Sequence, residues 1–295
     1  MTEMAVIGAG TMGNGIAHTF AHYGFTVNLV DVSSERLEKA LETISRNFDR
    51  QVTKGDVTPS AAAAALARIA KHTDLATGVA HADLVVEAAS EEVTTKMQIF
   101  RALDAAAPAN AILATNTSSI SITRIAAATR RPEKVIGMHF MNPVPIMPLV
   151  EVIKGYATSQ ETADAIVQLS GRLGKTPCVV NDYPGFIANR ILMPMINEAV
   201  YSLYEGVAGV TEIDTVMKLG MAHPMGPLRL ADFIGLDICL SILRVLQEGF
   251  GQPKYAPCPL LVNMVEAGRL GAKSGEGFYV YPAGTKEVYV SPRFL

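Results

Sequence analysis

The chain has 295 residues, which at about 150 residues per domain predicts two domains and excludes a small scaffold held by disulfides. Hydrophobic residues make up 49% and charged residues 18% of the sequence, a balance that excludes a disordered chain. Twenty-five basic against 28 acidic side chains leave a net charge of −3, so we expect no nucleic-acid partner and no attraction to an anionic membrane.

The sequence carries no signal for membrane insertion, secretion or metal binding. The most apolar stretch, residues 135–150, contains Pro143, Pro145 and Pro148, which would break a membrane-spanning helix. Three cysteines are too few and too widely spaced for a disulfide framework or a metal site. Strand-like sequence begins by Met4 with no leader before it, so we expect a cytoplasmic protein.

Short apolar runs alternate with longer amphipathic stretches in the first half of the chain. Strands are expected at Met4–Ile7, Thr26–Val30, Asp83–Glu87, Ala111–Thr115, Val135–His139, Leu149–Ile153 and Pro177–Val180. Helices are expected at Met12–Tyr23, Ser34–Gln51, Pro59–Ala70, Glu91–Ala106 and Gln160–Leu173. This alternation predicts an α/β domain, 1–183, with a doubly wound parallel sheet.

The strand signal stops after residues 181–185, and long amphipathic stretches follow. Helices are expected at Phe186–Tyr204, Thr211–Leu219, Leu228–Phe250 and Pro259–Ala267, with one short extended piece at Gly277–Tyr281. We therefore predict a smaller all-helical C-terminal domain, 184–295, for substrate binding and dimerisation. The apolar helices could equally form the core of a monomer.

A glycine-rich turn joins the first predicted strand to the first predicted helix. It contains Gly8, Gly10 and Gly13, with Thr11 and Met12 between the last two. Glycines at this spacing permit a tight turn, close approach of backbone to a pyrophosphate and close packing of helix on strand. The turn predicts a Rossmann-type dinucleotide site, with the anion at the helix N-terminus.

Asp31 ends the second predicted strand, 18 residues beyond Gly13. A carboxylate at about this offset accepts hydrogen bonds from the adenosine ribose and repels a 2′-phosphate, so NAD is favoured over NADP. The alternative is that Asp31 only caps the next helix.

His139 and Glu151 are predicted to lie opposite each other. They belong to consecutive strands joined by a turn rich in proline, and their numbers fit one antiparallel register. A carboxylate on one ring nitrogen fixes the tautomer and stabilises the imidazolium formed when the other nitrogen takes a proton. The pair therefore predicts a general base for an alcohol undergoing oxidation. Considered without Glu151, His139 could instead be a core histidine whose hydrogen bonds are satisfied and which has no catalytic role.

A polar segment, Thr115–Ser119, directly follows an apolar strand at the sheet edge where α/β domains bind ligands. Its hydroxyls and amide could hold a substrate oxygen and a nicotinamide ribose. The same residues could instead cap a helix near Ile122–Ala128.

Six segments together resemble one enzyme family. They are Val6–Gly13, Asn116–Ile120, Gly137–Pro145, Asp182–Arg190, His223–Pro227 and Lys273–Tyr279. Over residues 3–282 the chain resembles the 3-hydroxyacyl-CoA dehydrogenases, specifically the short bacterial 3-hydroxybutyryl-CoA dehydrogenase type. The tail, 283–295, has no counterpart in the resemblance.

The resemblance implies an NAD-dependent oxidoreductase acting at C3 of an acyl-CoA, working as a homodimer through the helical domain. It implies His139 as base, Glu151 as its orienting partner, and Ser118 with Asn189 on the reacting oxygen, in a cleft between the domains. Around the cofactor it implies Glu91, Lys96, Asn116, Ser118, Asn142 and Lys273. Glu91 and Lys96 could instead be ordinary charges at a helix end.

Arg50 and Lys54 lie at the end of the long second helix and in the loop after it. The resemblance places this region against the CoA tail, whose phosphates two cations would match. A solvated helix end is the alternative.

Two other functions fit parts of the sequence. A hydroxyacid dehydrogenase with a lysine base would use Lys175, which precedes a strand and has no carboxylate nearby in sequence. A catalytically silent NAD-binding protein would keep the fold without needing the four residues that the resemblance assigns to the chemistry.

Overall fold

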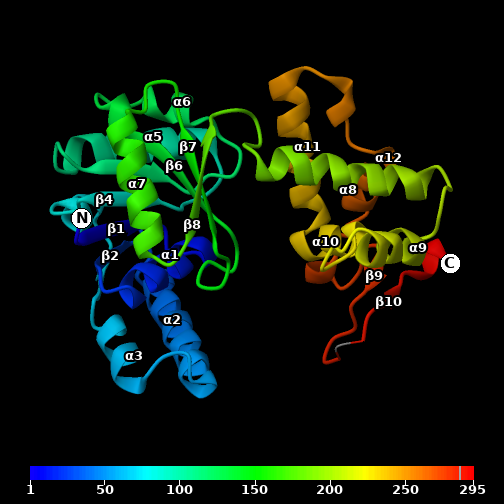
Figure 1. Ribbon diagram of the computed structural model, residues 1–295, viewed down its shortest axis with the longest axis horizontal. Helices are drawn as coiled ribbons and strands as arrows, with labels where there is room; N and C mark the ends of the chain where they lie inside the picture. Colours follow the sequence, from blue (N-terminus) through cyan, green and yellow to red (C-terminus); the bar gives the residue numbers. More distant parts are fainter. Residues whose placement is uncertain (286) are drawn as a thin grey trace. The chain divides into compact units, whose positions relative to one another are not determined.

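A computed structural model describes residues 1–285 and 287–295 (Figure 1). The chain forms two compact units, Met1–Tyr183 and Pro184–Leu295. The first unit is a mixed α/β domain built on one eight-stranded sheet, and the second is mainly helical. The predicted order, an α/β domain followed by a helical one, is confirmed.

The sheet of the first unit has the strand order β3-β2-β1-β4-β5-β6-β7-β8. Neighbours from β3 to β6 are parallel, β7 runs antiparallel to β6, and β8 is parallel to β7. The strands are β1 Glu3–Ile7, β2 Thr26–Val30, β3 Ile69–His72, β4 Leu84–Glu87, β5 Ile112–Thr115, β6 Val135–Phe140, β7 Leu149–Lys154 and β8 Thr176–Asn181. The order reverses between β1 and β4, and at such a point the carboxyl ends of the strands form a ligand crevice.

Seven helices of this unit are α1 Thr11–His22, α2 Ser34–Lys54, α3 Pro59–Leu66, α4 Leu75–Val79, α5 Val93–Ala106, α6 Ile122–Ala126 and α7 Gln160–Arg172. N-cap side chains determine where several of these helices begin. Ser33, Thr58 and Ser159 each accept a hydrogen bond from a first-turn amide, as N-cap residues do. Figure 1 shows α2 and α3 side by side, beyond one edge of the sheet.

Two predicted helix ends in the first unit differ most from the structure. The helix predicted over Pro59–Ala70 ends at Leu66, and the chain then forms β3, which pairs with β2. Alanine-rich sequence favours helix, but pairing with an exposed sheet edge outweighs that local preference. The helix predicted to end at Gln51 continues to Lys54, where Gly55 in a left-handed conformation ends it.

The helices of the second unit are α8 Ala188–Tyr204, α9 Val210–Thr215, α10 Pro227–Ile234, α11 Leu236–Phe250 and α12 Pro259–Glu266. A single helix was predicted over Leu228–Phe250, and this is wrong because Gly235, with φ +105°, separates α10 from α11. The short extended piece predicted over Gly277–Tyr281 contains β9 Tyr279–Val280, which pairs with β10 Tyr289–Val290, so the unit is mainly rather than wholly helical. The tail that the motifs leave unexplained therefore packs on this unit, with the ring of Phe294 5.8 Å from that of Phe278.

His18 is buried in the core between α1 and α2, where its ring stacks on Phe48 at 4.0 Å. Burial, followed by the charge of His22, lowers the pKa of His18 to about 4. An unfolded histidine titrates near pH 6.5, so acid favours the unfolded chain. The stability that neutral His18 contributes is complete above pH 6.5 and is lost as the pH falls toward 4.

We expect this linkage to cost about 2 kcal/mol of unfolding free energy between pH 7 and pH 5. His18→Phe keeps a stacked ring and removes the titration. Urea unfolding at both pH values should give a smaller difference for H18F than for the parent protein. An equal difference in the two proteins would assign the acid sensitivity to other groups.

Candidate active site

His139 and Glu151 form a buried pair across β6 and β7. The two residues are directly opposite in the antiparallel register, as predicted. The ring Nδ1 lies 2.7 Å from Oε2 of Glu151, and the side chains are 10% and 3% exposed. Because a carboxylate only accepts hydrogen bonds, Nδ1 is the donor in this contact.

Lys175 holds the turn that joins these two strands. Its buried Nζ donates to the carbonyl oxygens of Val144 at 2.6 Å and Met147 at 2.8 Å. Burial lowers the pKa of Lys175. The amine of Lys175 is held by two carbonyl oxygens and stabilises the turn. These contacts support a structural role for Lys175 rather than a role as catalytic base.

The glycine turn has the geometry that its spacing predicts. Gly8 has φ +100°, and a Cβ there would lie 2.7 Å from the carbonyl oxygen of Ala88. A Cβ on Gly13 would overlap the carbonyl of Gly8, whereas one on Gly10 would meet open space. The first-turn amides of α1 have no acceptor within the helix, so they suit an anion at this place.

Asp31 lies beside the glycine turn. Its Oδ2 accepts from the amide of Ala9 at 2.9 Å, and its Oδ1 accepts from the amide of Ser33 at 3.1 Å. The N-cap of α2 is Ser33, which accepts from the amide of Arg36. Asp31 is therefore not the helix cap, and its carboxylate stands next to the backbone that would meet a dinucleotide.

A cavity of about 490 Å³ opens between the glycine turn, α2 and the segment after β6. Gly10, Thr11 and Asn142 line it. So do five α2 residues that the sequence analysis missed, Arg36, Lys39, Ala40, Thr43 and Asn47. Their three- and four-residue spacing places them on one helix face, a signal that could have found them. The open Gly10, the cavity and the adjacent carboxylate together fit a dinucleotide.

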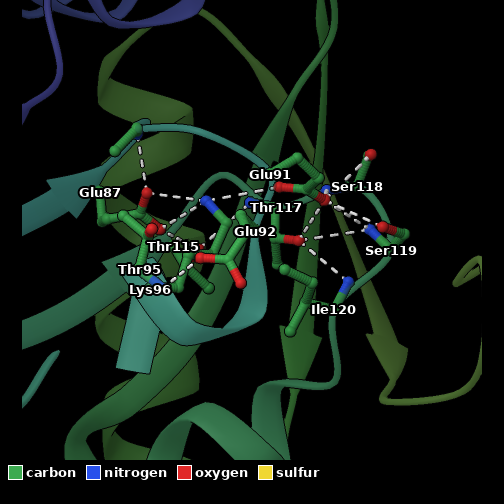
Figure 2. Close-up of polar contacts among 11 residues, drawn as sticks. Glu87, Glu91, Glu92, Thr95, Lys96, Thr115, Thr117, Ser118, Ser119 and Ile120 are labelled. Carbon is green, nitrogen blue, oxygen red and sulfur yellow. Dashed lines mark hydrogen bonds and ion pairs between the residues drawn. The ribbon is translucent and has the colours of Figure 1, made fainter. Parts of the chain in front are cut away.

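Glu91 organises the polar loop after β5 (Figure 2). Its Oε1 accepts from the hydroxyl of Thr117 at 2.5 Å and from the amides of Ser118 at 2.9 Å and Ser119 at 3.1 Å. Burial raises the pKa of Glu91, but Lys96 and these donors outweigh it and lower the pKa overall. The loop is thus held by a charged acceptor. The cap of α6 is a different residue, Ser121.

Asn116 connects this loop to β6. Its side-chain oxygen accepts from the amide of Phe140 at 2.9 Å. Phe140 directly follows His139, so one hydrogen bond joins the polar loop to the strand that carries the histidine.

Lys96 is buried at the same sheet edge. It is 1% exposed, and its Nζ lies 2.7 Å from Oε1 of Glu87 and 3.4 Å from Oε2 of Glu91. Glu87, which the sequence analysis did not single out, is the last residue of β4 and lies beside Thr115 in the sheet register. Glu87 could have been singled out from the sequence because it is a charged residue at the end of an apolar strand.

The other site residues predicted from the sequence lie outside the cavity and outside the network around Glu91. Asn189 is buried in the first turn of α8, and Lys273 binds Asp237 at 2.7 Å, both within the second unit. Arg50 and Lys54 are exposed on the last two turns of α2, beyond the residues that line the cavity.

Residues 3–183 match the family described as 3-hydroxyacyl-CoA dehydrogenase, NAD binding domain, and residues 185–281 match the corresponding C-terminal domain. The chain belongs to the 3-hydroxyacyl-CoA dehydrogenase family. The resemblance drawn from the motifs is thereby confirmed, and so is NAD as the cofactor.

Several similar proteins match this dehydrogenase over nearly its whole length. The probable 3-hydroxybutyryl-CoA dehydrogenase of Bacillus subtilis is 54% identical, covering 96% of this chain and 98% of the relative. The 3-hydroxybutyryl-CoA dehydrogenase of Bradyrhizobium diazoefficiens is 56% identical, covering 97% of each. The crystal structure of (S)-3-hydroxybutyryl-CoA dehydrogenase from Ralstonia eutropha has a TM-score of 0.93 at 48% identity. The match covers 96% of this chain and 99% of the chain in that structure.

Within residues 1–285 and 287–295, none of the helices is long and apolar enough to cross a membrane. The same residues contain no cluster of three or more histidine, cysteine or acidic side chains that could hold a metal ion.

Proposed function

We propose that this dehydrogenase interconverts (S)-3-hydroxybutyryl-CoA and acetoacetyl-CoA, with His139 as general acid and base and Glu151 as its partner. The buried contact of 2.7 Å between Nδ1 and Oε2 carries the proposal. The names of the relatives at 54% and 56% identity support the four-carbon substrate.

In the oxidative direction, Nε2 of His139 takes the proton of the 3-hydroxyl group as the C3 hydrogen leaves as hydride. NAD, when bound, accepts that hydride at its nicotinamide ring. The carboxylate of Glu151 stabilises the imidazolium that forms. In the reverse direction, the imidazolium returns its proton to the ketone oxygen.

Two further side chains are proposed to hydrogen-bond the reacting oxygen. Ser118 lies on the loop fixed by Glu91, so its hydroxyl is preorganised before the substrate arrives. Asn189 offers an amide from the first turn of α8. Donors held in place stabilise the charge on the oxygen without reorganising during the reaction.

For the cofactor, we propose that Gly8, Gly10, Thr11, Met12 and Gly13 receive the pyrophosphate and that Asp31 binds the adenosine ribose. The other proposed cofactor contacts are Glu91, Lys96, Asn116, Ser118, Asn142 and Lys273. Because Lys96 is buried against two carboxylates, we propose that it acts by fixing Glu91.

Arg50 and Lys54 are proposed to bind the phosphates of the CoA tail. Both are exposed at the end of α2. A guanidinium and an ammonium there can pair with phosphate groups without paying a large desolvation cost.

A homodimer through the second unit is also proposed. Several large apolar side chains of this unit are exposed, including Val207, Val216, Leu219 and Phe233. An apolar hollow of about 430 Å³ between α8 and α9 adds to them. Surfaces of this kind are typical of subunit contacts.

We also propose that the protein is located in the cytoplasm. Its three cysteines are free thiols, which suit a reducing compartment.

The substrate proposal is tested by following NADH consumption with 3-ketoacyl-CoA substrates from about C4 to C16. We expect kcat/KM to be highest for acetoacetyl-CoA and to fall with each added pair of methylene groups, because a pocket fitted to a short chain rejects longer ones. A maximum at C10 or longer would overturn the choice of substrate and leave the family assignment intact.

Asp31→Ala is expected to narrow the preference for NADH over NADPH by about 10- to 100-fold, since one charged acceptor is worth about 1.5–3 kcal/mol. The measurement is kcat/KM with each cofactor. Asp31→Asn serves as the matched control because it is nearly isosteric, removes the charge and keeps one of the two acceptor oxygens. An unchanged ratio in both variants would assign cofactor choice to other residues.

A further inference from the structure

Glu87 is a fully buried carboxylate with a complete set of partners. It is 0% exposed at the end of β4. Its Oε1 accepts from the amide of Ala89 and from Nζ of Lys96, each at 2.7 Å. Its Oε2 accepts from Lys96 at 3.0 Å and from the hydroxyl of Thr115 at 2.7 Å. A buried charge is tolerated only when it is paired and hydrogen-bonded in this way.

Lys96 stands between two carboxylates (Figure 2). The contact of its Nζ with Glu87 is the shorter one, and the contact with Oε2 of Glu91, at 3.4 Å, is the longer. The ammonium is therefore drawn toward Glu87 and away from Glu91. Its own side chain is buried, so it cannot turn to water to compensate for a lost partner.

The two oxygens of Glu91 face different partners. Oε2 faces Lys96, and Oε1 accepts from the loop that carries Ser118. Donors on this loop include the amides of Ser118 and Ser119 and the hydroxyls of both serines. The orientation of the Glu91 carboxylate therefore sets the position of Ser118.

We propose that Glu87 is a positioning residue that fixes Ser118 through Lys96 and Glu91. The inference rests on the role proposed above for Ser118. Without the charge of Glu87, Lys96 is attracted by Glu91 alone, and the ion pair at 3.4 Å shortens to hydrogen-bond distance. The carboxylate of Glu91 then turns from the loop toward Lys96, and the hydroxyl of Ser118 loses its fixed position.

Glu87→Gln tests the chain of contacts because it is nearly isosteric, removes the charge and keeps one of the two acceptor oxygens. We expect kcat for acetoacetyl-CoA reduction to fall about 10- to 100-fold, because a misplacement of about 1 Å near the reacting atoms can cost about 10²-fold. Asp104→Asn is the matched control. Asp104 is a second buried carboxylate of this unit, paired with Arg130 and Arg131 at the other end of α5. D104N should lower the melting temperature and leave kcat unchanged.

A double-mutant cycle with Ser118→Ala separates positioning from general support of the fold. The proposal predicts that S118A lowers kcat and that E87Q has no further effect in the S118A background. If the two losses multiply, or if E87Q alone keeps the parent kcat, Glu87 does not act through Ser118 and the inference is overturned. If S118A keeps the parent kcat, the proposed role of Ser118 fails first, and the inference fails with it.

Glu87→Gln combined with Lys96→Gln provides a second route if E87Q does not fold. Neutral amides in place of a buried ion pair are tolerated better than one unpaired charge. This double variant leaves Glu91 without the ammonium that orients its Oε2, so Glu91 is released rather than drawn toward Lys96. The loop again loses its fixed acceptor, and we expect kcat to fall and to become insensitive to S118A. A parent-like kcat would contradict the proposal.

Discussion

His139→Asn is expected to lower kcat for acetoacetyl-CoA reduction by about 10²- to 10⁴-fold, the usual loss when a general acid or base is removed. The amide of asparagine can fill the space and keep a hydrogen bond to Glu151, but it cannot carry the proton. Steady-state kinetics measure kcat, and the change in NADH fluorescence on titration with the protein measures the Kd for NADH, since the chain contains no tryptophan. The Kd should stay within about twofold because the cofactor is proposed to bind through the glycine turn.

His81→Asn is the matched control, because His81 is exposed on the loop before β4 and belongs to no proposed site. H81N should keep the parent kcat. If H139N also stays within about twofold of the parent, the proton comes from another group and the proposed mechanism is wrong.

Glu151→Gln is expected to lower kcat by about 10²-fold or more, since neutralising the equivalent carboxylate of a Ser-His-Asp triad costs about 10⁴-fold. Glutamine can still accept from Nδ1, but it offers the imidazolium no opposite charge. Glu151 is 2% exposed, so water cannot replace the missing charge. The loss should appear in kcat more than in KM.

The pair can be tested as a unit by combining both substitutions. If Glu151 works through His139, the variant H139N/E151Q should have the kcat of H139N alone. Losses that multiply would show that Glu151 acts on something other than this ring, and a parent-like E151Q would remove it from the mechanism.

The residues that the sequence placed correctly are those governed by local pattern. Buried strands read as apolar runs, and the period of two along a strand allowed the opposition of His139 and Glu151 to be predicted from their numbers. The glycine turn was likewise predictable, because Gly8 and Gly13 stand where a side chain would overlap backbone.

The errors arose where tertiary contacts outweigh local preference. Residues 69–72 follow an alanine-rich helix and carry no strand alternation, yet the exposed edge of β2 pairs with them. Gly235 has helical neighbours on both sides, and only the packing of the unit reveals the break there. The sequence does not show whether a single charged residue within a helix is exposed or buried. Lys96 could have been a solvated charge, but the structure shows that it is buried.

Glu87 was missed for a related reason. Its partners come from three segments, the loop after β4, the end of β5 and the first turns of α5, and no sequence spacing links them. The network exists because the parallel strands end at one edge of the sheet. A charged residue at the last position of an apolar strand is therefore worth singling out in other sequences of this fold.

Single-turnover mixing tests the central claim most directly. The complex of the dehydrogenase with NADH is mixed with acetoacetyl-CoA, and the loss of NADH absorbance follows the chemical step without product release. The account predicts that this step is slowed about 10²- to 10⁴-fold in H139N and about 10²-fold or more in E151Q, with NADH still bound. Equal single-turnover rates in the parent and both variants would contradict it.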